Sequence, residues 1–273
     1  MYRIASVNDL SGLGNCSLMA SIPIMSAMGV QVSPLPTAIL SAQTGFKNFS
    51  FFDFTPEMEE YINNWQKINV KFHGIATGFL GSEDQIDIVR RFCEEHRESL
   101  IVVDPVMGSN GVICKTYTEA MCYKMKELIK LAQVVTPNIT ESSIITGSHM
   151  HYSGDDILKF YKEEAEKISE IGPEHVIITG IIKEGNILNL AFNRKEKEFY
   201  LSSVPYNEKS YSGTGDIFTS IVSVAMVKGK GLEESVKTAT SFIYKVVEYT
   251  ESFSDHGNEG IKFQPFLGEL CGL

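Results

Sequence analysis

The segment LIVVDPVMG (residues 100–108) decides the fold class, because four consecutive apolar residues are followed directly by Asp104 and Pro105. A short apolar run is typical of a strand that is buried on both faces, as strands are in parallel sheets. Asp104 would then lie at the carboxyl edge of the strand, where open α/β sheets bind their ligands. The alternative is an Asp-Pro turn that only ends the strand.

On both sides of this segment, short apolar runs alternate with longer amphipathic stretches, which is the pattern of repeated βα units. We expect strands near residues 3–7, 31–38, 71–77, 100–104, 133–135 and 174–179. We expect helices near residues 15–28, 55–68, 82–97, 117–130, 138–145, 153–170, 214–229 and 232–249. The alternating stretch from Gly185 to Ser203 predicts an antiparallel pair at one edge of the sheet. The predicted fold is one α/β domain over residues 1–273, with a mostly parallel sheet.

The amino-acid composition of the chain argues against several classes of function. The chain has 273 residues, of which 43% are hydrophobic and 21% charged, so it can bury a globular core. Its formal net charge of −10 disfavours sequence-independent nucleic-acid binding, which depends on Lys and Arg contacts to phosphates. Its five cysteines include no CxxC pair, which favours a reducing, cytoplasmic environment. No apolar run approaches the roughly 18 residues of a membrane span, so we expect no membrane contact.

A glycine-rich turn, SGTGDIFTS (residues 212–220), runs directly into an apolar-periodic helix. The amides of Gly213, Thr214 and Gly215 at a helix N-terminus would form an anion hole for charge on a transferring phosphoryl group. Asp216, in the first turn, would act as the general base that accepts the proton of a hydroxyl group. The alternative is a tight turn with an Asp that stabilises the helix N-terminus.

A third strand end, VTPNITE (residues 135–141), leads into another predicted helix. Asn138 is expected to be its N-cap, and Glu141 three residues later completes the spacing of a capping box. The functional interpretation is that Asn138 and Glu141 reach a Mg²⁺ ion on the ATP phosphates, directly or through water. Both interpretations stay open at this stage.

These motifs, taken in order with SVNDLSGLGN (6–15), LSAQTGF (40–46) and TGFLGS (77–82), resemble the pyridoxal (vitamin B6) kinase family of the ribokinase-like superfamily. The resemblance extends from Ile4 to about Thr250. It implies a three-layer α/β/α fold with a small antiparallel edge. It also implies ATP-dependent phosphorylation of the 5′-hydroxymethyl group of a B6 vitamer, with Asp216 as base. A homodimer, Mg²⁺ and often K⁺ are further implications.

The resemblance also implies which residues contact each substrate. The vitamin ring would be bound by Ser6 and Thr44, beside Asp216, with apolar walls from Leu13, Phe46 and Phe79. The ATP site would be formed by Asp104, Thr136, Asn138, Glu141 and Thr179, with Gly213, Thr214 and Gly215 under the phosphates. Asp104, Asn138 and Glu141 would be the candidate metal ligands, possibly through water.

Two departures from this pattern and several rivals remain. Val7 stands where many members carry His, and Thr179 stands where many carry a Lys near the nucleotide. The segment DLSGLG (9–14) also resembles the hydroxymethylpyrimidine kinases of thiamin synthesis, although Thr44 to Phe46 fits the pyridoxal group better. A vitamin-binding protein without turnover is a rival from another class. A sugar or nucleoside kinase is disfavoured, because the predicted alcohol site is too apolar for sugar hydroxyls.

Overall fold

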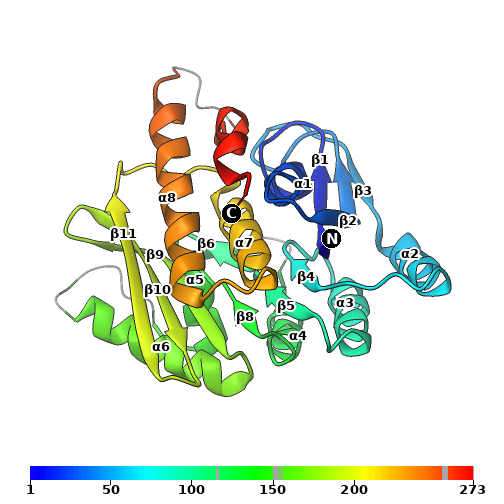
Figure 1. The fold of residues 1–273 in the computed structure, drawn as a ribbon, viewed down its shortest axis with the longest axis horizontal. Coiled ribbons are helices and arrows are strands. Elements are labelled where there is room, and N and C mark those ends of the chain that lie inside the picture. Colours follow the sequence, from blue (N-terminus) through cyan, green and yellow to red (C-terminus); the bar gives the residue numbers. More distant parts are fainter. Residues whose placement is uncertain (115–116, 150–153, 155, 254–257, 273) are drawn as a thin grey trace.

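The computed structural model describes residues 1–114, 117–149, 154, 156–253 and 258–272, and these contain one nine-stranded sheet and a two-stranded hairpin (Figure 1). The strands of the large sheet are β1 (Arg3–Ser11), β2 (Gln31–Leu40), β3 (Phe51–Asp53), β4 (Gly74–Thr77), β5 (Leu100–Val103), β8 (Val134–Val135), β9 (His175–Lys183), β10 (Asn186–Asn193) and β11 (Glu198–Pro205). Their order is β11-β10-β9-β8-β5-β4-β1-β2-β3. The neighbours from β9 to β2 all pair in parallel, as the βα pattern predicts.

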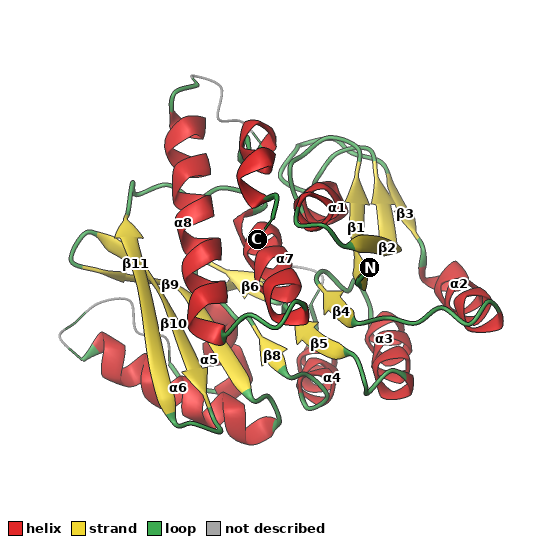
Figure 2. Cartoon of the chain, in the orientation of Figure 1, coloured by secondary structure: helices red, strands yellow, loops and turns green. Residues whose placement is uncertain are grey.

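The helices are α1 (Ser17–Ala27), α2 (Thr55–Lys67), α3 (Glu83–Glu95), α4 (Glu119–Ile129), α5 (Ile139–Thr146), α6 (Ile157–Ile171), α7 (Thr214–Val227), α8 (Leu232–Glu251) and the 3-10 helix η1 (Gln264–Leu270). Helices α1, α7, α8 and η1 share one buried apolar cluster, and α2 to α6 share the other. Figure 2 shows helices on both sides of the sheet. The predicted helix at 153–170 begins at Ile157 in the structure, and residues 150–153 and 155 lie outside the described residues.

Successive residues of a buried strand contribute side chains to the two clusters in turn. Ile4 contacts the α1 and α7 side while Ala5 contacts the opposite side. On β5, Val102 belongs to the cluster shared by α1 and α7, and Val103 belongs to the opposite cluster. Successive strand side chains point to opposite faces, so a strand covered by helices on both sides must be apolar at nearly every position. The three-layer α/β/α fold class is confirmed.

Both sheet edges are antiparallel. β10 and β11 form the pair predicted between Gly185 and Ser203. β3 pairs with β2 at the other edge through Ala38 to Leu40, and the sequence did not predict it. At three residues β3 is too short to show an alternating pattern, and its residues are exposed, so no burial signal marks it.

The loop after Asp104 forms a hairpin of β6 (Gly108–Ser109) and β7 (Val112–Ile113). Asn110 and Gly111 occupy its turn with φ of 50° and 78°, the left-handed values of a two-residue hairpin turn. The amide of Gly111 donates to Thr140 Oγ1 at 3.0 Å. The hairpin is thereby tied to the first turn of α5.

In the described part of the chain, no helix combines the length and apolarity needed to cross a membrane. All five cysteines are free thiols. The carboxyl ends of β1, β4, β5 and β8 all lie at the same edge of the sheet, because these strands are parallel neighbours. Asp9 lies near the end of β1, and Gly78, Asp104 and Thr136 directly follow β4, β5 and β8. The polar side chains of the candidate active site lie at this edge.

Candidate active site

The glycine turn at residues 212–215 leads directly into α7, which begins at Thr214. Gly213 precedes the helix with φ of 91°, in the left-handed region that favours glycine. A Cβ atom on Gly213 would lie 1.9 Å from the carbonyl oxygen of Asn15, so no side chain fits there. The turn brings the amides at the N-terminus of α7 beside Asp216, the arrangement that the sequence predicts for an anion hole.

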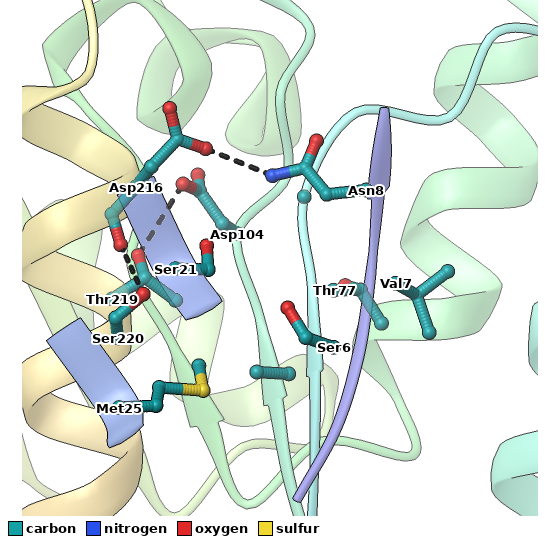
Figure 3. Close-up of a pocket in the computed structure, with 12 residues that line it drawn as sticks. Ser6, Val7, Asn8, Ser21, Met25, Thr77, Asp104, Asp216, Thr219 and Ser220 are labelled. Atoms are coloured by element: carbon teal, nitrogen blue, oxygen red, sulfur yellow. Dashed lines mark hydrogen bonds between the residues drawn. The ribbon is translucent and has the colours of Figure 1, made fainter. Parts of the chain in front are cut away.

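Asp216 is half-buried in the first turn of α7. Its Oδ1 accepts a hydrogen bond from Asn8 Nδ2 at 2.8 Å (Figure 3). Burial raises the pKa of Asp216 to about 6, although hydrogen bonds from the Ser17 amide and from Asn8 oppose that rise. A carboxylate with this pKa is ionised at neutral pH and still basic enough to take a proton from an alcohol in the transition state.

Asn8 is held in a single orientation by its neighbours. Its Oδ1 accepts from the backbone amides of Phe79 at 2.9 Å and Asp9 at 3.0 Å. A Cβ atom on Gly78 would lie 2.3 Å from Asn8 Nδ2, so glycine is needed at that strand end. The side-chain NH₂ group of Asn8 therefore faces Asp216, and the carboxylate is positioned from two elements far apart in the sequence.

Asp9 lies next to this pair and is buried. It accepts hydrogen bonds from Ser11 Oγ at 3.0 Å and from Ser17 Oγ at 2.6 Å. Burial raises the pKa of Asp9, and its charge contributes to the raised pKa of Asp216. The sequence analysis assigned no role to Asn8 or Asp9. The signal for both was two consecutive polar residues in an otherwise buried strand.

Asp104 lies where the sequence predicts, directly after β5, and it is buried. Its Oδ2 accepts from Thr219 Oγ1 at 3.3 Å, and Thr219 Oγ1 lies 2.9 Å from Thr136 Oγ1. Burial raises the pKa of Asp104 well above its ordinary value, and the charges of Glu141 and Asp216 raise it further. Asp104 thus joins the glycine-turn helix to the strand end that carries Thr136.

Asn138 and Glu141 form the predicted capping box at the start of α5. Asn138 Oδ1 accepts from the amides of Thr140 at 2.8 Å and Glu141 at 3.0 Å. Its Nδ2 donates to Gly108 O at 2.9 Å. Both polar atoms of Asn138 are therefore used within the protein. A direct bond from this oxygen to a metal would compete with the two hydrogen bonds, and the contact with Mg²⁺ through water stays a prediction.

Glu141 is buried in the same cap. Its Oε2 accepts from the Asn138 amide at 2.8 Å and its Oε1 from the Met107 amide at 3.2 Å. Burial raises the pKa of Glu141 to about 8. Keeping the two neighbouring buried carboxyl groups of Asp104 and Glu141 both ionised is unfavourable unless a cation offsets their charge.

The donor chemistry of this pair fits Mg²⁺, which prefers carboxylate and phosphate oxygens and keeps several waters. Among the described residues, no group of three or more His, Cys, Asp and Glu side chains could hold a metal ion. Asp104 and Glu141 are the charged candidate ligands, and nucleotide phosphates and water would complete the shell. Thr179 lies beside Asn138 through a bridge between β9 and the strand end, and it brings no charge there.

Four of the five residues predicted to surround the vitamin ring lie in loops at the carboxyl edge. Leu13 and Gln43 are joined by a backbone hydrogen bond of 2.8 Å, which brings the loop carrying Thr44 and Phe46 against the loop after β1. Phe79 follows β4 and is hydrogen-bonded to Asn8. Leu13 is 56% exposed, so its side chain is available to an incoming ligand.

Ser6 is the exception, because it lies deeper in β1 and is 2% exposed. It lines a polar cavity together with Thr77, Asp104 and Asp216, and the cavity volume of about 10 Å³ is room for one water molecule. A pyridine ring is larger than this cavity, and contact between Ser6 and the vitamin ring stays a prediction. Asn8, two residues further along the same face of β1, is the polar side chain at the level of Asp216 (Figure 3).

The three-layer fold, the glycine turn with Asp216, and the acidic pair beyond it define a ribokinase-like small-molecule kinase, a phosphotransferase with an alcohol acceptor. More particularly, the chain belongs to the phosphomethylpyrimidine kinase family, whose model matches residues 14–261.

Some of the similar proteins are named pyrimidine kinases, and others are named pyridoxine or pyridoxal kinases. The chain is 27% identical to the hydroxymethylpyrimidine/phosphomethylpyrimidine kinase of Haemophilus influenzae, covering 91% of this chain and 93% of that one. It is 29% identical to the pyridoxine kinase of Bacillus subtilis, covering 66% and 64%. A presumed phosphomethylpyrimidine kinase of Bacteroides thetaiotaomicron has a crystal form with pyridoxal. It is 39% identical to this chain, and the match covers 98% of this chain and 95% of that chain with a TM-score of 0.93. The pyridoxal kinase of Lactobacillus plantarum, at 22% identity, 99% and 96% coverage and a TM-score of 0.90, shows the same fold.

Proposed function

We propose that this kinase transfers the terminal phosphoryl group of ATP to the 5′-hydroxymethyl group of a B6 vitamer: pyridoxal, pyridoxamine or pyridoxine. The single observation that carries the proposal is the placement of Asp216. Its carboxylate is positioned by Asn8 and stands beside the amides at the N-terminus of α7. A base and an anion hole on one helix turn are the parts that in-line phosphoryl transfer requires.

In this mechanism Asp216 accepts the proton of the hydroxymethyl group as its oxygen attacks the γ-phosphorus of ATP. The bond from the γ-phosphorus to the bridging oxygen breaks, and the electron pair leaves with ADP. The amides of Gly213, Thr214 and Gly215 donate hydrogen bonds to the phosphoryl oxygens as negative charge gathers there. When bound, Mg²⁺ would neutralise phosphate charge, and Asp104 and Glu141 would hold it.

Two similarities support a B6 vitamer as acceptor. A relative at 39% identity has a crystal form with pyridoxal, and a curated relative is named a pyridoxine kinase. The exposed Leu13 and the half-buried Phe46 and Phe79 offer apolar surface suited to a flat ring. Hydroxymethylpyrimidine is the second candidate, because the family model and several curated relatives carry that name. Both acceptors present a hydroxymethyl group on a six-membered nitrogen ring.

The test is ATP consumption by the purified protein with Mg²⁺ and K⁺, with the three B6 vitamers and hydroxymethylpyrimidine supplied separately. We expect kcat/KM to be highest for a B6 vitamer. Turnover of the pyrimidine alone would move the protein to the second candidate, and absence of turnover with all four acceptors would contradict the proposal. The homodimer, the K⁺ requirement, the cytoplasmic location and the single-domain organisation stay predictions from the sequence.

A further inference from the structure

The segment from Asn258 to Gln264, after the last long helix, returns to the candidate active site. Ile261 and Phe263 fix it in place, because both are buried in the cluster shared by α1 and α7. The polar atoms of the segment contact three separate loops of the site. We call residues 258–264 the C-terminal brace.

The first contact is with the loop after β1. The amide of Asn15 donates to Glu259 O at 2.7 Å, and Gln264 Nε2 donates to Asn15 Oδ1 at 2.8 Å. Asn15 is therefore held through its backbone and its side chain at once. Its carbonyl oxygen is the atom against which Gly213 is packed.

The second contact is with the glycine turn. The amide of Ile261 donates to Ser212 O at 3.3 Å. Gly260 has φ of +79°, and a Cβ atom there would lie 2.7 Å from Ser212 O and 3.3 Å from Asn15 O. The brace, the glycine turn and the loop after β1 are therefore packed so closely that an added methyl group at Gly213 or Gly260 would collide with the backbone of a neighbouring segment.

The third contact is with the loop after β2, which carries Thr44 and Phe46. Gln43 Nε2 donates to Asn258 O, and Asn258 Nδ2 donates to Gly45 O. Gln43 Oε1 in turn accepts from the amide of Gly45 at 2.9 Å. These bonds fix the position of the loop that faces the acceptor alcohol in the proposed function.

We propose that the C-terminal brace is a positioning element that aligns the glycine turn carrying Asp216 with the two loops on the alcohol side. This inference rests on the proposed function for its kinetic consequence. The hydrogen bonds of the brace described above are made to Asn15, Ser212, Gln43 and Gly45 and not to Asp216, so the brace acts through these residues. Displacing a reacting group by about 1 Å can lower a rate about 10²-fold, so a loose brace would slow the chemical step.

The first test compares Gly260→Ala with Gly29→Ala. Both glycines have φ of +79°, but a Cβ on Gly29 meets no atom within 4 Å. Both variants therefore place Ala at the same left-handed φ, and only Gly260→Ala pushes on the glycine turn. We expect Gly260→Ala to lower kcat at least tenfold relative to Gly29→Ala. Equal kcat in two folded variants would overturn the proposal.

A second pair of variants covers the case in which Gly260→Ala does not fold. The double variant Asn258→Ala/Gln264→Ala removes two exposed side chains of the brace, and Asn64→Ala/Gln66→Ala removes two exposed side chains of α2. We expect equal Tm values for both, with faster hydrogen exchange at Asn15 and Gly45 in the brace variant alone. Its kcat should fall at least tenfold, with the KM for ATP within twofold of the control.

The two readouts separate the inference from the proposed function. Hydrogen exchange needs no substrate, so unchanged exchange at Asn15 and Gly45 overturns the brace even if no acceptor is found. Faster exchange with an unchanged kcat in an active enzyme shows a structural contact with no positioning role. Failure of the wild-type protein to phosphorylate any acceptor contradicts the proposed function and leaves the exchange result to decide on the brace.

Discussion

Asn8 Nδ2 lies 2.8 Å from Asp216 Oδ1, and this hydrogen bond joins the end of β1 to the start of α7 across 208 positions of sequence. Two backbone amides hold the oxygen of Asn8, so its NH₂ group is the one that meets the carboxylate. A donor fixed in this way stabilises the ionised form of Asp216 and keeps it aligned. The pair is thus the structural basis for assigning Asp216 as the base.

Replacing Asp216 by Asn should lower kcat about 10²–10⁴-fold, the usual contribution of a general base. Asn retains an oxygen that can accept from Asn8 and from the Ser17 amide, so the fold and ATP binding should persist. Steady-state kinetics and nucleotide-dependent thermal shifts measure the two effects. Near-normal turnover in this variant would remove Asp216 from the mechanism.

The pH dependence of kcat/KM should show an acid limb near pH 6. Burial raises the pKa of Asp216 to about 6, and the base acts only when ionised, so activity should rise with pH through that value and then level off. Asn8→Leu removes a hydrogen bond that lowers this pKa, so the limb should move to higher pH. Because Leu has no donor, an unchanged limb would mean that the bond does not tune the base.

Asp104→Asn should raise Tm in EDTA at pH 8. The pKa of Asp104 is raised in the folded protein by burial, Glu141 and Asp216, so its stabilising contribution exists below its unfolded pKa and is lost as pH rises through the folded value. At pH 8, well above the unfolded pKa, the buried carboxyl group therefore destabilises the fold, and Asn avoids that cost while it can still accept from Thr219. The same variant should need more Mg²⁺ for half-maximal activity. A lower Tm than wild type in EDTA would show that the charge is compensated within the protein.

Asn138→Ala should lower the free energy of unfolding by about 1–2 kcal/mol, because it removes an N-cap that bonds two amides. Thr118→Ala is the matched control, since Thr118 caps α4 through one bond to the Met121 amide and should cost less, about 1 kcal/mol. Urea unfolding measures both. If Asn138→Ala instead left stability unchanged and weakened the Mg²⁺ response tenfold, Asn138 would be a ligand and not a cap.

The residues that sequence reasoning placed well are those whose roles are set by neighbours close in the chain. Gly213 precedes a helix that begins one residue later, Asp104 follows an apolar strand, and Asn138 with Glu141 forms a cap within four positions. The depth of Ser6 is a property of the opposite kind. Its residue type suits hydrogen bonding to a ring, but its depth in β1 depends on the sheet and the helices around it.

The sequence by itself determined the layered α/β fold, the glycine turn and the order of the acidic strand ends, because strand periodicity, helix caps and left-handed glycines are local properties of the chain. Only the tertiary structure decided that Asn8 meets Asp216, that Asn138 is fully used in a cap, and that residues 258–264 contact three loops of the site. These contacts depend on the strand order β5-β4-β1 and on the path of the chain after α8. Distances between residues hundreds of positions apart are fixed by packing, which no local pattern encodes.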